Sequence, residues 1–249
     1  TFDVAEEPAA LRPLAEVVRV LFDGGGRLID SSPMYGRAEA VTGRLLRDLG
    51  QPRAFAATKV WADGKEAGMR QMEESFRLLG VPHMDLMQVH NLRDWRTHIA
   101  TLRDWKEAGR IRYIGITTSR KEQFEEFAAV MRAERLDFVQ LNCSMGEREA
   151  EQVLLPLAQD RGMATLINRP YMRGELFSRV RGKALPAWAA EFDCTSWGQF
   201  FMKFIVAHPA VTCVIPATTS VVNMRDNLAG GMGRLPDEAL RQRMIAALA

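Results

Sequence analysis

A regular alternation of two kinds of segment constrains the fold of this 249-residue chain more than any other feature. Short runs of apolar residues alternate with longer amphipathic runs whose apolar residues recur every three to four positions. This pattern is typical of βαβ units, which build a parallel sheet covered by helices. We expect strands at residues 27–30, 54–59, 84–90, 113–117, 137–142, 164–168 and 212–216.

Amphipathic helices are expected around these strands. The first is indicated by Leu14, Val17, Val18 and Leu21, which share one helix face, and it ends at the glycine triplet 24–26. The others are expected at residues 38–49, 64–79, 95–108, 121–132, 147–159, 197–207, 221–228 and 236–249. An irregular insertion is expected at 170–193.

The alternation and the length favour a (β/α)8 TIM barrel, formed as a single domain over residues 1–249. The length is close to the ~250 residues typical of this fold. No Pro/Gly-rich linker or shift in composition marks a second domain. The alternative is a doubly wound open sheet, for which a G-x-G-x-x-G turn is expected after the first strand. The chain has no such motif, so we favour the barrel.

Only seven strand ends are expected, one fewer than the eight strands of a full barrel. They are Asp30, Lys59, His90, Thr117, Gln140, Pro170 and Pro216. One ~30-residue βα unit back from Asp30 reaches the beginning of the chain. We therefore expect the first strand to be missing from this chain, and the natural chain to extend roughly 20 to 35 residues further N-terminally.

The composition limits the classes of partner that this chain is expected to bind. The net charge is +2 and no long basic run occurs, so we expect neither nucleic acid nor a membrane as partner. The three cysteines form no C-x-x-C pair, which argues against a disulfide framework or a cysteine zinc site. No apolar run reaches the ~18 residues of a membrane span. The cytoplasm is the expected location, although a start without Met leaves an upstream export signal open.

Three expected strands end in residues suited to acid–base chemistry. Asp30, Lys59 and His90 follow one another at the spacing of a βα unit, and Tyr35 lies in the loop after Asp30. Strand ends of a barrel share one face, so we expect these side chains to meet. A tyrosine has a pKa of ~10, and a lysine ammonium beside it lowers that value. Together with an aspartate and a histidine it makes a general acid for a developing alkoxide, and a cofactor must supply the hydride.

Several motifs, in order along residues 14–230, resemble those of the aldo-keto reductases. The segment 30–39, which runs from Asp30 through Tyr35 to Glu39, resembles the family signature D-[ST]-A-x-x-Y-G-x-[AS]-E. TKVW at 58–61 resembles T-K-[LV]-W, and MDLMQVH at 84–90 resembles V-D-L-x-x-x-H. IGI at 114–116, FVQLN at 138–142, and VIP at 214–216 followed by Asn227 continue the resemblance.

The resemblance implies a role for each matching residue. Tyr35 is expected to be the general acid, Lys59 and Asp30 to tune it, His90 to orient the carbonyl, and Trp61 to line the substrate pocket. The cofactor is expected to be NADPH, bound without a Rossmann motif. Thr117, Thr118 and Gln140 are expected to hold the nicotinamide carboxamide. The adenosine phosphate end is expected to lie along Thr218, Ser220, Asp226 and Asn227.

Four departures from the family pattern concern the cofactor. Thr117–Thr118 replaces a Ser-Asn pair, and Asn168 stands where a tyrosine often stacks on the nicotinamide. Ala217 and Asn223 replace a lysine and an arginine that hold the 2′-phosphate as a point charge and a bidentate fork. These two losses weaken the expected preference for NADPH, so NADH is the alternative cofactor.

Two functions are consistent with these residues. The first is NAD(P)H-dependent reduction of an aldehyde or ketone, a small-molecule carbonyl substrate, to an alcohol. The alternative, suggested by the altered cofactor residues, is a non-catalytic NAD(P)H-binding or regulatory protein on the same scaffold. No metal site is expected, because His83 and His90, seven residues apart, face opposite sides of a strand. His98 and His208 are expected at helix surfaces or ends. No motif indicates the particular substrate or the oligomeric state.

Overall fold

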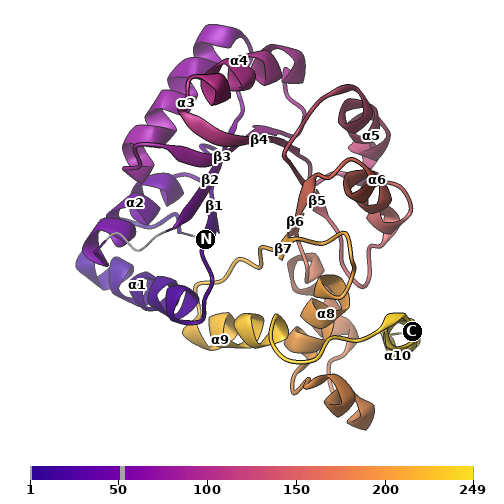
Figure 1. Cartoon of the computed structure of the whole chain (residues 1–249). Coiled ribbons are helices and arrows are strands. Elements are labelled where there is room, and N and C mark those ends of the chain that lie inside the picture. Colours follow the sequence, from indigo (N-terminus) through magenta and orange to yellow (C-terminus); the bar gives the residue numbers. More distant parts are fainter. Residues whose placement is uncertain (1, 51–53, 249) are drawn as a thin grey trace. The chain divides into compact units, whose positions relative to one another are not determined.

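The computed structural model describes residues 2–50 and 54–248 (Figure 1). They divide into two compact units. The first comprises the described residues up to 118, with 135–138 and 217–224, and the second comprises 119–134, 139–216 and the described residues from 225 onward.

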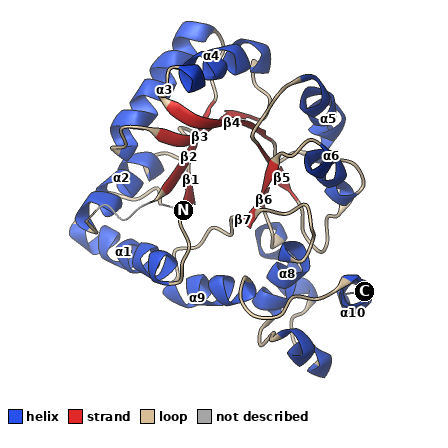
Figure 2. Ribbon diagram, in the orientation of Figure 1, coloured by secondary structure: helices blue, strands red, loops and turns tan. Residues whose placement is uncertain are grey.

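The first unit has four strands that alternate with helices. Its elements are α1 (Pro8–Asp23), β1 (Leu28–Asp30), α2 (Ala38–Asp48), β2 (Phe55–Val60), α3 (Lys65–Leu79), β3 (Met84–His90), α4 (Trp95–Glu107) and β4 (Ile111–Thr117). The strands pair in parallel in sequence order. Figure 2 shows α2, α3 and α4 on the outer side of these strands. β2 and β3 are buried along almost their whole length, as expected for parallel strands covered on both faces.

The register of the first unit places the ends of three strands side by side. Asp30 pairs with Ala57, Lys59 with Gln88, and His90 with Thr117. Parallel strands have their carboxyl ends at the same edge. The residues predicted to carry chemistry in the first unit therefore share one edge of its strands.

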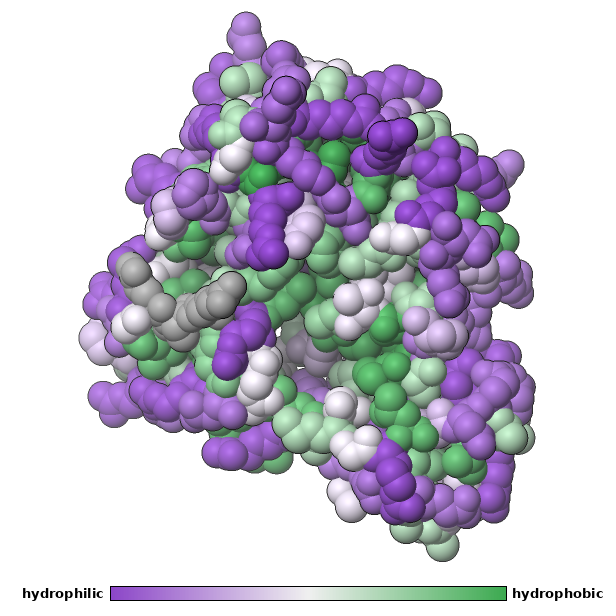
Figure 3. All heavy atoms as spheres, viewed as in Figure 1, coloured by the Kyte–Doolittle hydropathy of each residue, from purple (hydrophilic) through white to green (hydrophobic). Residues whose placement is uncertain are grey.

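Helix packing in the first unit follows the apolar faces of the sequence. Leu11, Leu14 and Val18 of α1 pack against Val41 and Leu45 of α2 in one buried cluster. In the space-filling view, hydrophilic residues cover the outer faces of α3 and α4 (Figure 3). Burying these apolar faces stabilises helices that intrinsic propensity alone leaves marginal.

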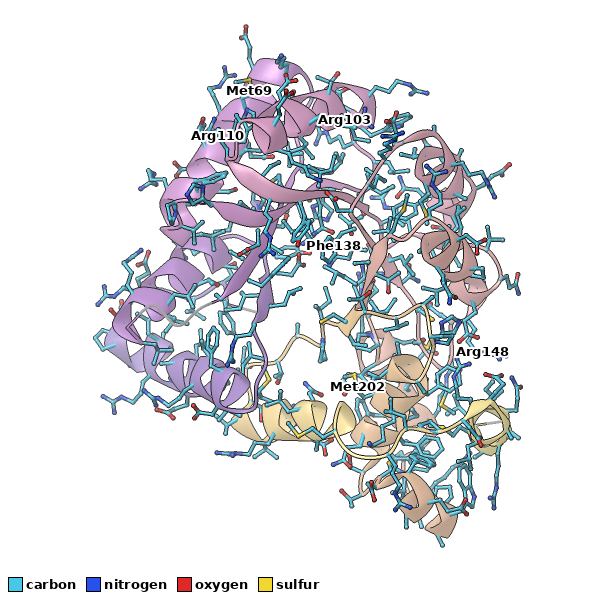
Figure 4. All side chains as sticks on the ribbon, viewed as in Figure 1. Met69, Arg103, Arg110, Phe138, Arg148 and Met202 are labelled. Carbon is cyan, nitrogen blue, oxygen red and sulfur yellow. The ribbon has the colours of Figure 1, made fainter. Side chains whose placement is uncertain are left out.

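An aromatic cluster lies at the opposite ends of the strands in the first unit. The Tyr113 ring lies 5.3 Å from that of Phe138 and 6.1 Å from that of Phe55, between ring centroids. Phe138 is among the residues labelled in Figure 4. All three residues belong to the amino-terminal halves of their strands, so this cluster marks the end of the sheet away from the candidate chemistry.

The second unit has shorter elements. They are 3-10 turns at Lys121–Gln123, Glu149–Glu151, Met172–Gly174 and Ala187–Phe192; helices α5 (Phe124–Ala133), α6 (Leu154–Asp160), α7 (Glu175–Arg179), α8 (Trp197–Val206), α9 (Val221–Gly230, which begins in the first unit) and α10 (Glu238–Leu248); and strands β5 (Phe138–Asn142), β6 (Ala164–Asn168) and β7 (Cys213–Val214). β6 pairs in parallel with β7 through Leu166 and Ile167.

The helix expected at 147–159 and the strand expected at 212–216 differ most from the sequence pattern. The helix expected at 147–159 divides into a 3-10 turn and α6, because Pro156 is tolerated only in the first turn of a helix. The strand expected at 212–216 is reduced to Cys213–Val214. Before it, the side chain of Thr212 accepts from the Thr165 N–H at 3.0 Å, in place of a ladder bond.

The described residues contain seven strands, the number expected from the strand ends, and residues 2–7 form none. No helix in the described part of the chain combines the length and apolar character that crossing a membrane requires.

Candidate active site

Lys59 and Asp30 form a buried ion pair at the carboxyl ends of β2 and β1. The Lys59 Nζ donates to Asp30 Oδ2 at 2.5 Å and to the Ser31 carbonyl at 2.7 Å. The Lys59 side chain is 1% exposed and that of Asp30 is 7% exposed. Gln88 of β3 donates from Nε2 to the other Asp30 oxygen at 3.2 Å. Removing one partner of such a pair leaves an uncompensated buried charge. Each member of the pair therefore depends strongly on the other for the stability of the folded state.

Tyr35 lies beside this pair. The Lys59 Nζ is 5.4 Å from the centroid of the tyrosine ring, and the His90 ring meets that ring edge-on at 6.2 Å. Tyr35 is 42% exposed, whereas Lys59 is buried. The structure thus brings Asp30, Tyr35, Lys59 and His90 together as one cluster, with the phenol as its accessible member.

His90 is almost fully buried at the end of β3. Its Nδ1 lies 3.1 Å from the Ser32 hydroxyl. Burial, reinforced by the positive charge of Lys59, lowers the pKa of His90 from 6.5 to about 3. The ring is therefore neutral at physiological pH. Sequence analysis missed Ser32, whose contact with His90 spans 58 positions.

Trp61 lies in the loop after β2, close in sequence to Lys59. The Arg93 guanidinium is 4.1 Å from its ring centroid, and Arg93 also pairs with Asp63. The buried His98 lies 2.7 Å, at Nε2, from the Ala62 carbonyl of the same loop. His98 was expected at a helix surface or end; it lies in the first turn of α4, but it is buried and not at the surface.

A buried carboxylate lies behind β2. Glu39 of α2 accepts hydrogen bonds from Thr58 of β2 and Ser75 of α3. Burial raises the pKa of Glu39 above its ordinary 4.5, although these hydrogen bonds oppose the shift. Glu39 thereby ties two helices to the residue that precedes Lys59. The sequence contains Glu39 within a motif, but nothing in the motif shows this network.

The candidate cofactor residues of the first unit all have hydroxyl-bearing side chains. Thr117 and Thr118 are buried at the end of β4, and Thr117 is the register partner of His90. In the turn before α9, the Thr218 hydroxyl accepts from the Ser220 N–H at 3.1 Å and the Ser220 hydroxyl accepts from the Asn223 N–H at 3.3 Å. Because each of these two oxygens accepts from the backbone, its own hydrogen is directed to other acceptors.

The candidate cofactor residues of the second unit include two that hold neighbouring elements. Asp226 accepts from the Ser196 hydroxyl and from Gln199 Nε2, each at 2.8 Å. Asn227 Oδ1 accepts from the Tyr171 hydroxyl at 2.6 Å. Their predicted role at the adenosine phosphates stays a prediction, alongside this observed role in anchoring α9.

Gln140 is buried within β5. Asn142, two residues further, lies on the same face of that strand, and its Oδ1 is buried without a hydrogen-bond partner in the described part of the chain. A buried orphan acceptor is costly unless a donor reaches it. Sequence analysis missed this acceptor.

The structure also places Asn168 and His208, two residues that the sequence analysis singled out. Asn168 ends β6, and Arg169 follows it with a positive φ of 50° and donates to the Ser119 hydroxyl at 3.1 Å. His208 accepts from the Ala210 N–H at the end of α8. Within residues 2–50 and 54–248, no group of three or more His, Cys, Asp or Glu side chains could hold a metal ion.

Comparison with known proteins fits this geometry. The family model described as "Aldo/keto reductase family" matches residues 4–243. The chain therefore belongs to the aldo/keto reductase family. It is 29% identical over 185 residues to Aldo-keto reductase YhdN of Bacillus subtilis, which covers 66% of this chain and 54% of that protein. It is 24% identical to Methylglyoxal reductase YeaE of Escherichia coli, covering 92% of this chain and 82% of that one. An NADH-specific methylglyoxal reductase of Escherichia coli is 26% identical, covering 66% of this chain and 58% of that one. The chain thus spans only about half the length of YhdN.

Solved structures define the fold. An aldo/keto reductase from Klebsiella pneumoniae, in complex with NADP and acetate, matches with a TM-score of 0.77 at 21% identity over 98% of this chain and 88% of that one. Aldo-keto reductase AKR11C1 from Bacillus halodurans matches with a TM-score of 0.75 at 22% identity, over 99% of this chain and 88% of that one. The predicted fold class, the (β/α)8 barrel of the aldo-keto reductases, is confirmed.

Proposed function

We propose that this protein reduces an aldehyde or ketone to an alcohol, with hydride from a nicotinamide cofactor and a proton from Tyr35. The observation that carries the proposal is the buried Lys59–Asp30 pair against the ring of the exposed Tyr35. The desolvation of two buried charges can outweigh their attraction, so a buried ion pair contributes little to stability by itself. Here it lies beside Tyr35, the most exposed residue of the cluster.

The proton transfer follows from the charges. As hydride reaches the carbonyl carbon, negative charge develops on the carbonyl oxygen, and the Tyr35 hydroxyl gives its proton to that oxygen. The phenolate left behind is stabilised by the Lys59 ammonium, 5.4 Å from the ring centroid. Asp30 and the Ser31 carbonyl fix the ammonium in place through their hydrogen bonds.

His90 suits a different task. Its lowered pKa keeps the ring neutral, so it orients the substrate oxygen through a hydrogen bond and leaves the proton transfer to Tyr35. The Trp61 ring, held against Arg93, is proposed to form a wall of the substrate pocket.

A nicotinamide cofactor supplies the hydride when bound. Thr117, Thr118 and Gln140, all buried, are proposed to hold its carboxamide. Thr218, Ser220, Asp226 and Asn227 are proposed to lie along the adenosine phosphate end, where the hydroxyl groups of Thr218 and Ser220 are the candidate donors to a phosphate. We propose NADPH as the cofactor, supported by the NADP complex of a structural neighbour. NADH is the alternative, supported by a relative named NADH-specific.

Small carbonyl compounds are the proposed substrates. Two relatives are named methylglyoxal reductases, which supports a small aldehyde. A single domain over residues 1–249 and a cytoplasmic location stay predictions.

Turnover combined with binding tests the proposal. The purified protein is titrated with NADPH and NADH by fluorescence, and cofactor oxidation is then followed with a panel of aldehydes and ketones that includes methylglyoxal. Carbonyl-dependent oxidation of the cofactor is expected. Tight binding without turnover on any member of the panel would contradict the proposal and favour a non-catalytic NAD(P)H-binding protein.

A further inference from the structure

Ser32 occupies the position at which the aldo-keto reductase signature has alanine. Its side chain is fully buried in the loop between β1 and α2. Its hydroxyl oxygen lies 3.1 Å from His90 Nδ1 and accepts from the Met34 N–H at 3.3 Å. Alanine has no group that could make either bond, so this contact is a feature of this chain rather than of the signature.

The neighbours of the Ser32 hydroxyl determine whether it donates to His90 or accepts from it. A hydroxyl has one hydrogen and two lone pairs. The Met34 N–H uses one lone pair. If His90 carried its proton on Nδ1, both neighbours of the hydroxyl would be donors, and its hydrogen would lack an acceptor in a fully buried place. No other acceptor for Ser32 Oγ lies within hydrogen-bond distance in residues 2–50 and 54–248. Buried hydroxyl hydrogens are rarely left unpaired.

The opposite arrangement satisfies every group. Ser32 donates to Nδ1, and the proton of the neutral imidazole then resides on Nε2. Within the described part of the chain, Nε2 of His90 has no hydrogen-bond partner, so its hydrogen is available to a substrate oxygen.

We propose that Ser32 is a positioning residue that locks His90 in the Nε2–H tautomer and so makes it a hydrogen-bond donor to the substrate carbonyl. The loop geometry supports this role. The Ser32 carbonyl accepts from the Tyr35 N–H at 2.9 Å, so the same residue places the loop of the proposed proton donor. Ser32 thereby links His90 with Tyr35. The catalytic consequence rests on the proposed function, but the tautomer does not.

Long-range 1H–15N correlation spectra of histidine-labelled protein test the tautomer directly. The chain has four histidines, and the signals of His90 are assigned by their loss in His90→Gln. Unprotonated Nδ1 and protonated Nε2 are expected for His90 in the native protein. A proton on Nδ1 overturns the proposal, whatever the variants do.

Two serine variants isolate the hydroxyl. Ser32→Ala is expected to release the lock, so that the His90 nitrogen signals move toward an average of both tautomers. It is expected to lower kcat/KM by about 3- to 10-fold through the loss of one hydrogen bond. Ser32→Thr, which keeps the hydroxyl, is expected to restore the native signals. Ser31→Ala is the matched control, because the Ser31 Oγ is buried without a partner in the described residues and its removal leaves the His90 tautomer unchanged.

The outcomes separate the two proposals. An unchanged His90 spectrum in Ser32→Ala overturns the lock. A native Nε2–H tautomer that is lost in Ser32→Ala supports the lock even if the protein turns over no carbonyl, and in that case the proposed function fails by itself.

Discussion

Asp3 caps the loop that carries Tyr35 by accepting from the Arg37 N–H at 3.0 Å. The contact joins the segment before α1 to the residues directly after the phenol. Gly36 lies so close that a Cβ there would come within 2.4 Å of the Asp3 carboxyl carbon, and it has a positive φ of 60°. The N-terminal segment thus takes part in setting the position of Tyr35.

Removing this cap should disturb Tyr35 more than the fold. Asp3→Ala is expected to lower kcat/KM by about 3- to 10-fold, because the loop loses its anchor. The same change is expected to cost about 1 kcal/mol of stability, which corresponds to a fall of about 2–4 °C in Tm. Asp3→Asn, which keeps an acceptor for Arg37, serves as the control and should retain most of the activity. Equal losses in both variants would show that charge, not the cap, matters.

The Lys59–Asp30 pair makes a prediction about stability. Asp30→Asn leaves the Lys59 ammonium buried without its counter-charge, which is expected to cost about 3–5 kcal/mol in denaturant unfolding. The double variant Asp30→Asn with Lys59→Met has no buried charge and is expected to recover much of that loss. Both are expected to lack activity. A single variant as stable as the native protein would contradict the strong coupling of the pair.

The depressed pKa of His90 predicts how stability depends on pH. Below pH ~6.5 the unfolded chain binds a proton at this residue, whereas the folded chain does so only near pH 3. Stability should therefore fall as the pH falls from about 6.5 toward 3. His90→Gln is expected to reduce this slope in urea titrations made at several pH values. His208, whose pKa burial also lowers, is left unchanged in both proteins. Equal slopes in both would contradict the assignment.

The lost cations at the proposed 2′-phosphate end predict a change in cofactor preference. Asn223→Arg restores the charge that the family pattern has at this position and is expected to tighten NADPH binding by about tenfold. Binding of NADH, which lacks the 2′-phosphate, should not change. Val222→Arg is the matched control, because Val222 is 74% exposed on the same helix, one position away. Fluorescence titration measures both cofactors, and equal effects on NADPH and NADH would contradict the proposed position of the phosphate.

Local pattern predicted the strands and helices well where the pattern was strong. The strands at 84–90 and 164–168 have the expected bounds, because short runs dominated by apolar residues end there at the polar residues His90 and Asn168. The helix expected at 147–159 was too long because Pro156 fixes where α6 can begin. The spacing of apolar residues alone does not reveal the limit that a proline sets on where a helix begins.

The site was predictable only in part. Spacing by one βα unit was enough to bring Lys59 and Asp30 together, since parallel register places consecutive strand ends side by side. The Ser32–His90 bond, the burial of His98 and the Glu39 network were not predictable. Each depends on the path of a loop or on packing between helices, and a sequence pattern carries neither.

The most direct test of the central claim is the turnover of Tyr35→Phe. This change removes one hydroxyl and keeps the ring that Lys59 and His90 contact. Carbonyl-dependent oxidation of NADPH is expected to fall by at least about 100-fold, the typical contribution of a general acid. Cofactor binding by fluorescence should stay within about twofold of the native value, because the phenol hydroxyl is proposed to meet the substrate and not the cofactor. Full turnover in Tyr35→Phe would contradict the claim that Tyr35 donates the proton.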